Sequence, residues 1–102
     1  MRNFRLTSDA KSDLIEIRRF TTKQWGAAQS HKYLLDLRQT IRLLAETPTL
    51  GRPRPDVGSD VLSFPQVSHV IYYVLHKQQL VVFGVLHKRM VPLNHRPERE
   101  VI

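Results

Sequence analysis

The positions of apolar residues predict a helix soon after the start of the chain. Residues 4–6 alternate between apolar and polar side chains, which favours a short strand. Thr7 then offers an N-cap side chain, and Asp9 places an acidic group in the first helical turn. Gly26 suits the left-handed conformation common after a helix C-terminus, so the helix is predicted to end near Trp25. The apolar stripe between these limits follows helical spacing and comprises Ala10, Leu14, Ile15, Ile17, Phe20 and Thr21.

A second helix is predicted to begin almost at once. Residues 27–29 favour helix, and Pro48 disfavours helical conformation in the residue before it. Two amphipathic helices with so short a joint should fold back as an antiparallel hairpin. Each has one apolar face, so the pair needs another layer of structure to cover it. The apolar face of the second helix comprises Tyr33, Leu37, Ile41, Leu44 and Ala45.

The second half of the chain changes from helical spacing to strand-like runs. Residues 47–60 contain three prolines and two glycines, which is typical of a loop. Residues 61–64 form a short β-like run, and residues 70–75 and 80–86 are rich in β-branched and aromatic side chains. The polar residues 76–79 separate the two longer runs and predict a hairpin, whose nearly continuous apolar character indicates central strands.

This order of elements, β-α-α-β-β-β, predicts an α+β fold in which the helical hairpin packs on a small antiparallel sheet. The length of 102 residues suits a single domain, which we expect to span residues 1–102. The tail over about residues 92–102 is polar, and we expect it to be loosely held.

Composition excludes several classes of protein. The chain has no cysteine, which rules out a disulfide scaffold, a thiolate zinc site and a cysteine nucleophile. No apolar run reaches the ~18–20 residues that span a bilayer. The first nine residues show no apolar segment typical of a signal peptide. We therefore expect a cytoplasmic protein without a membrane segment.

The charge balance favours an acidic partner. Sixteen Lys and Arg residues against nine Asp and Glu give a net charge of +7. Two basic clusters stand out: residues 52–55, where prolines stiffen the chain beside Arg52 and Arg54, and residues 87–90, which contain Lys88 and Arg89. Cations on the loops of a rigid scaffold suit recognition of an acidic partner, and a solvated basic rim is the alternative.

The five histidines show no compact metal-ligand spacing, and we expect no metal site and no cofactor. His69 and His87 could nevertheless meet across the predicted hairpin. If the turn centres on residues 77–78, His69 faces Leu86 and His87 points to the other side. A register change of one residue would place the two histidines opposite each other. Structural or surface roles are favoured for these side chains.

Enzymatic chemistry has few candidate groups in this sequence. There is no Gly-x-Ser-x-Gly elbow and no glycine-rich phosphate loop. Cleavage of RNA without a metal needs acid–base groups, and cations around the phosphate. Residues 70–75 and 80–86 contain no Lys or Arg, so phosphate charge would be poorly stabilised there. The candidates for such a ribonuclease are His69, Tyr73, His87, Lys88 and Arg89.

Several short motifs occur together, in one order, along residues 4–95. The most specific are Trp25-Gly26, Gly51-Arg52, Ser68-His69-x-Ile71-x-Tyr73 and Leu86-His87-x-x-Met90. In this combination the chain resembles the ParE branch of the RelE/ParE superfamily of type II toxins. It departs from that pattern at Leu62 and Ser63, where many relatives carry an arginine, and at Val91, where relatives often have an aspartate.

The resemblance implies a toxin that is made with a small ParD-like antitoxin and is neutralised by it in a hetero-oligomer. Members of this branch typically poison DNA gyrase, whereas RelE relatives cut mRNA. The resemblance therefore implies a protein-binding poison that is not an enzyme and that does not bind nucleic acid sequence-specifically. The alternatives are a RelE-like, ribosome-dependent mRNA endoribonuclease and a non-toxic module that only binds the antitoxin.

Two surfaces of this toxin follow as hypotheses. Charge and loop position place the target-binding surface at Arg52, Arg54, Lys88, Arg89 and Met90. A set of apolar side chains is expected to serve the core first and to dock the antitoxin second. These are Leu14, Ile17, Phe20, Trp25 and Tyr33.

Overall fold

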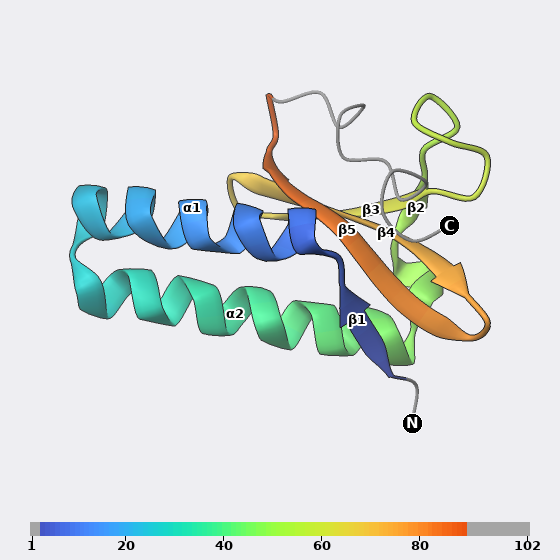
Figure 1. The fold of residues 1–102 in the computed structure, drawn as a ribbon, viewed down its shortest axis with the longest axis horizontal. Coiled ribbons are helices and arrows are strands. Elements are labelled where there is room, and N and C mark those ends of the chain that lie inside the picture. Colours follow the sequence, from blue (N-terminus) through green and yellow to red (C-terminus); the bar gives the residue numbers. More distant parts are fainter. Residues whose placement is uncertain (1–2, 90–102) are drawn as a thin grey trace.

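Two antiparallel helices cover one face of a five-stranded sheet in the computed structural model, which describes residues 3–89 (Figure 1). The predicted tail, together with Met90 and Val91, lies outside the described residues. Within residues 3–89, neither helix is long and apolar enough to cross a membrane. The elements in order are β1 (Phe4–Leu6), α1 (Ser8–Trp25), α2 (Ala27–Glu46), the 3-10 turn η1 (Pro48–Leu50), β2 (Arg52–Pro53), β3 (Leu62–Gln66), β4 (His69–His76) and β5 (Gln79–His87).

Local signals set the ends of both helices as the sequence predicts. The Thr7 hydroxyl accepts a hydrogen bond from the Ala10 amide at 3.2 Å and caps the start of α1. Gly26 ends that helix with a φ of +90° and a ψ of 164°, which suits glycine but differs from the predicted left-handed helical conformation. Its amide donates to the carbonyl of Thr22 at 2.9 Å. The second helix ends at Glu46, two residues before Pro48.

The predicted apolar stripe of α1 is wrong at two positions. Ala10, Ile17 and Thr21 are buried, but Ile15 and Phe20 are 54% and 58% exposed. At about 100° per residue, Phe20 points about 80° and Ile15 about 140° away from the centre of the buried face. They are therefore large apolar side chains on the surface of the helical hairpin.

The sheet is mixed, which corrects the predicted antiparallel arrangement. Its strand order is β1-β5-β4-β3-β2, and β1 pairs with β5 in parallel, from Phe4 beside Leu80 to Leu6 beside Val82. The other three pairings are antiparallel. After β1, the helical hairpin carries the chain to β2 at the other edge of the sheet. Three antiparallel pairings then lead back across the sheet and place β5 beside β1 in the same direction. The short strand β2 lies in the segment that was predicted to be a loop.

A bulge decides how β4 and β5 match. The turn at Lys77 and Gln78 has positive φ at both residues and pairs His76 with Gln79. In an unbroken ladder, that turn would place His69 opposite Leu86. The register shifts between Tyr72 and Tyr73, where Phe83 of β5 has no partner, so His69 faces His87.

Both faces of the sheet are buried, which explains the nearly continuous apolar runs of the central strands. One face packs against the helices, where the most buried side chains include Leu37, Ile41, Leu44, Ile71, Tyr73, Leu80, Val82 and Val85. The other face carries a second cluster that includes Tyr72, Val74, Val81, Phe83 and Leu86. The loop between β2 and β3 adds Val57 and Val61 to this second cluster.

Tyr73 joins the sheet to the turn that follows α2. Its side chain is fully buried, and its hydroxyl donates to the carbonyl of Pro48 at 2.7 Å. Gly51 lies against the end of this ring. The close approach explains why a residue without a side chain occupies position 51.

Replacing Gly51 by alanine is expected to lower the free energy of unfolding by about 2–3 kcal/mol. A Cβ atom at this position would overlap the hydroxyl end of the buried Tyr73 ring. The control is Gly51→Ala in a Tyr73→Phe background, where the overlapped hydroxyl is absent and the added cost of the Cβ should be smaller. Unfolding in urea measures both, and equal costs would contradict the explanation.

Candidate partner-binding site

An open groove of about 750 Å³ runs along the helical hairpin where β1 lies against both helices. Its floor is apolar and comprises Phe4, Leu6, Leu14, Ile15, Leu34 and Leu35. Arg18 and Arg38 also line it and bring positive charge to it, and His31 adds an imidazole. The helices and β1 thus build one concave surface of mixed apolar and positive character.

The groove leaves large apolar side chains in contact with water. Ile15 is 54% exposed and Leu35 is 46% exposed. Contiguous exposed apolar surface with a polar rim is typical of interaction sites. An amphipathic segment with carboxylates would cover the floor with its apolar side and place its charges beside Arg18 and Arg38.

Of the five residues predicted to dock the antitoxin, only Leu14 lines this groove. Ile17 and Tyr33 are buried in the core, as their primary role required. Phe20 and Trp25 are exposed but lie outside the groove lining, and the Trp25 ring packs edge-on against Tyr33 at 5.7 Å between centroids. The docking role of these five residues stays a prediction.

The sequence reasoning missed Ile15, Leu34 and Leu35 as groove residues. A signal was present, because Leu34 and Leu35 adjoin the buried stripe of α2, and Arg38 follows one turn later. What the pattern of one helix could not show is that Leu34 and Leu35 share a surface with Ile15 of the other helix. That juxtaposition depends on how the two helices and β1 meet.

A buried polar cluster ties α2 to the ends of β3, β4 and β5. The Tyr33 hydroxyl donates to the carbonyl of Gln66 at 2.9 Å and lies 2.7 Å from Nδ1 of His69. Because this hydroxyl has one hydrogen, the bond to Gln66 assigns the proton of the second contact to Nδ1 of His69. The rings of His69 and His87 lie edge to face at 5.8 Å between centroids.

Burial and the neighbouring His87 together lower the pKa of His69, with burial the larger cause. His87 is less buried, and its Nδ1 accepts a hydrogen bond from the Arg89 amide at 3.2 Å. The two rings therefore form a contact between β4 and β5 at the end of the hairpin. Among residues 3–89, no three His, Asp or Glu side chains gather closely enough to hold a metal ion.

The five candidates for a ribonuclease do not all converge. His69 and His87 meet, and Lys88 and Arg89 follow at the end of β5. Tyr73, however, lies four residues along β4 from His69, and its hydroxyl is engaged by Pro48 in the buried core. The phenol is therefore not available to a reaction centred on the two histidines.

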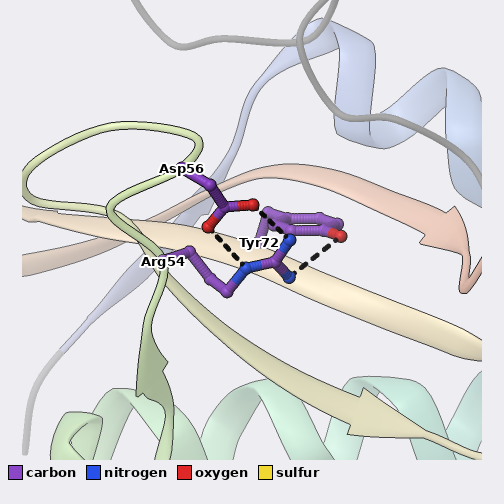
Figure 2. Close-up of polar contacts among 3 residues, drawn as sticks. All are labelled: Arg54, Asp56 and Tyr72. Carbon is purple, nitrogen blue, oxygen red and sulfur yellow. Dashed lines mark hydrogen bonds and ion pairs between the residues drawn. The ribbon is translucent and has the colours of Figure 1, made fainter.

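Arg54 is held by its own loop and sheet (Figure 2). Its Nε and Nη2 donate to the two carboxylate oxygens of Asp56 at 3.0 and 2.9 Å. Its Nη1 lies 3.4 Å from the Tyr72 hydroxyl, and the guanidinium carbon is 5.3 Å from the centroid of that ring. The hydrogen bonds from Arg54 are the main cause that lowers the pKa of Asp56.

The two basic clusters lie in different parts of the sheet. Arg52 and Arg54 belong to β2 and the loop after it, whereas Lys88 and Arg89 follow β5, and β3 and β4 separate these strands. The Lys88 amide is bonded to the carbonyl of Ser68 at 2.9 Å. Met90, the fifth residue of the predicted target surface, lies outside the described residues.

Comparison with known proteins gives consistent results. Residues 4–92 match the family described as ParE toxin of type II toxin-antitoxin system, parDE. Toxin ParE1 of Caulobacter vibrioides is 31% identical over 90 residues, which cover 88% of this chain and 93% of the relative. Toxin ParE of Escherichia coli is 33% identical over 89 residues, which cover 83% of this chain and 84% of the relative.

A solved structure shares the fold. A chain from the chromosomal ParDE TA system of P. aeruginosa superposes with a TM-score of 0.75 over 85% of this chain and 96% of that one. Its sequence is 16% identical. The arrangement of two helices on a five-stranded sheet is therefore shared with that structure.

The stability of the protein is expected to decline as the pH falls below about 6.5, the usual pKa of histidine. His69 has a lowered pKa in the folded chain, so the unfolded chain binds a proton at a pH where the folded chain does not. The decline ends only below the lowered pKa of the folded state. His69→Gln should reduce the change in urea midpoint between about pH 7 and pH 5. His31→Gln, at an exposed helical position, should leave that change intact, and equal behaviour of the two variants would rule out His69 as its source.

Proposed function

Because the chain belongs to the ParE toxin family of type II toxin–antitoxin systems, we propose that it poisons DNA gyrase by binding and that a ParD-like antitoxin neutralises it. In this proposal the protein forms a hetero-oligomer with the antitoxin in the cytoplasm and catalyses no reaction. A poison of this kind needs a surface that fits its partners and no group of reactive side chains.

The groove on the helical hairpin is the observation that carries the antitoxin part of the proposal. Its floor exposes Ile15 and Leu35, and Arg18 and Arg38 line the same concave surface. We propose that an acidic, amphipathic segment of the antitoxin lies there, with apolar side chains against the floor and carboxylates beside the two guanidinium groups. A segment that folds as it binds could follow the whole length of the groove.

The net charge and the exposed cations support the gyrase part. Arg52 is exposed on β2, and Lys88 and Arg89 are exposed directly after the end of β5. Positive side chains on a rigid scaffold speed association with an acidic surface and set its orientation. The separation of Tyr73 from His69 and His87 also favours inhibition by binding over RNA cleavage.

Leu35→Glu is expected to weaken binding of the cognate antitoxin by about 30-fold or more, because a carboxylate would replace apolar contact in the groove floor. Leu43→Glu is the matched control: Leu43 lies on the same helix and is similarly exposed, but it does not line the groove. Both variants should keep the wild-type free energy of unfolding within about 0.5 kcal/mol. Titration calorimetry measures the affinities, and an equal effect of the two substitutions would exclude the groove as the docking site.

The purified protein is expected to inhibit supercoiling by gyrase and to leave in-vitro translation intact. Lys88→Gln combined with Arg89→Gln should raise the concentration needed for inhibition by about tenfold, through loss of two contacts to the target. Arg19→Gln combined with Lys23→Gln removes the same charge from the exposed side of α1. This control should change the concentration needed for inhibition by less than about twofold.

Other outcomes would assign the chain a different function. Cleaved mRNA with normal supercoiling would indicate a RelE-like ribonuclease and direct mutagenesis to His69 and His87. Normal growth on expression of soluble protein that still binds the antitoxin would indicate a non-toxic module.

A further inference from the structure

The guanidinium of Arg54 has a fixed position before any partner arrives. It lies over the ring of Tyr72, whose side chain is almost fully buried. The backbone beneath it is also held, because the Arg54 amide donates to the carbonyl of Val61 at 2.8 Å. The Arg54 carbonyl accepts from the amides of Val57 and Gly58 at 2.9 and 3.1 Å. The sheet and the loop together therefore fix the direction in which the guanidinium N–H groups of Arg54 point.

Asp56, whose carboxylate accepts the hydrogen bonds from Arg54, is the more exposed of the two residues. The side chain of Asp56 is 63% exposed, whereas that of Arg54 is 25% exposed. The two parallel bonds from Nε and Nη2 are the arrangement that arginine makes with carboxylates in general. Because exposed ion pairs add little to stability, rotation of Asp56 into water would disturb the fold only slightly.

The positive charge of Arg52 also stabilises a carboxylate at the position of Asp56. Arg52 lies two residues before Arg54, on the edge strand β2, and is exposed. Its positive charge contributes to the lowered pKa of Asp56, after the larger effect of the hydrogen bonds from Arg54. A carboxylate at this position is thus stabilised by hydrogen bonds from the oriented Arg54 guanidinium and by the nearby positive charge of Arg52.

We propose that Arg54 on Tyr72, with Arg52 beside it, is a binding site for a carboxylate of a protein partner, and that Asp56 occupies this site while the chain is alone. The partner's Asp or Glu side chain takes the place of Asp56, which turns into solvent. The site rests on the proposed function, in which the partner is the protein target. It lies on the face of the sheet opposite the helices and is therefore separate from the groove.

Arg54 then has a different role from the one expected from the sequence. In the isolated protein its charge is balanced internally, so Arg54 does not act as an open cation on a loop. An internal competitor reduces the apparent affinity for the partner, because the partner can bind only during the fraction of time for which the site is open. Asp56 is therefore expected to tune how tightly the target binds.

The test compares two variants that each remove one negative charge. Asp56→Asn opens the proposed site. Glu16→Gln removes the negative charge from the exposed contact of Glu16 with Arg19, a single hydrogen bond of 3.1 Å on α1. Both raise the net charge equally, so a general electrostatic effect appears in both. The probe is a labelled oligoglutamate peptide, and short duplex DNA and inorganic phosphate are titrated in parallel. Thermal unfolding of each variant checks that the fold is retained.

If Asp56 fills the site for about four fifths of the time, Asp56→Asn tightens peptide binding about fivefold. Glu16→Gln changes it by less than about twofold. Adding Arg54→Lys to Asp56→Asn keeps the positive charge, loses the fork and abolishes the gain. Equal effects of Asp56→Asn and Glu16→Gln would overturn the proposal, and so would a gain that survives Arg54→Lys. If Asp56→Asn binds DNA or phosphate more tightly than the wild type but binds the peptide equally, a carboxylate is not the ligand of the site.

Gyrase inhibition separates this proposal from the proposed function. If the wild-type chain inhibits gyrase and Asp56→Asn behaves like Glu16→Gln in every titration, the site is wrong and the function stands. If Asp56→Asn binds the peptide more tightly but no variant inhibits gyrase, the site stands and the target is a different protein.

Discussion

The parallel pairing of β1 with β5 is the constraint on which the rest of the structure depends. It brings residues 4–6 beside residues 80–82. Hydrogen bonds from the Leu80 amide to the carbonyl of Asn3 and from the Thr7 amide to the carbonyl of Val82 flank this pairing. Because α1 starts at the residue after Thr7, this pairing fixes where the helical hairpin enters. Asp13 then accepts a bond from the Val85 amide and holds α1 along the same strand. The groove exists because β1, placed in this way, meets both helices.

A sheet that is apolar on both faces separates the groove on the helical hairpin from the site at Arg54. The helices cover one face and build the groove from their outward side chains, whereas the loop between β2 and β3 covers part of the other with Val57 and Val61. Arg54 fastens that loop over Tyr72. An antitoxin segment in the groove and a target carboxylate at Arg54 would therefore bind opposite sides of one thin layer. Neutralisation then requires either an antitoxin that extends around the sheet or a target that also needs the helical side.

The edges of the sheet and its buried polar groups show how the same fold avoids unwanted contacts. The edge strand β2 has two residues, one of them a proline without an amide hydrogen, and α1 covers part of the opposite edge through Asp13.

In the interior, the Tyr33 hydroxyl donates to the Gln66 carbonyl and accepts from the His69 ring. The bond to Tyr33 therefore gives His69, one of the predicted ribonuclease candidates, a structural role at the junction of α2 with the sheet.

The sequence by itself determined the features that depend on neighbouring residues: the cap at Thr7, the break at Gly26, the two helices, the hairpin turn at residues 77–78 and the membership in a toxin family. Only the tertiary structure decided the parallel partner of β1, the bulge that sets His69 against His87, the groove of Ile15 with Leu35, and the engagement of Arg54. Helix periodicity and caps act within a few residues and can be read locally. Strand partners, bulge positions and shared surfaces arise from contacts between distant segments, and several arrangements of those segments satisfy the same local pattern.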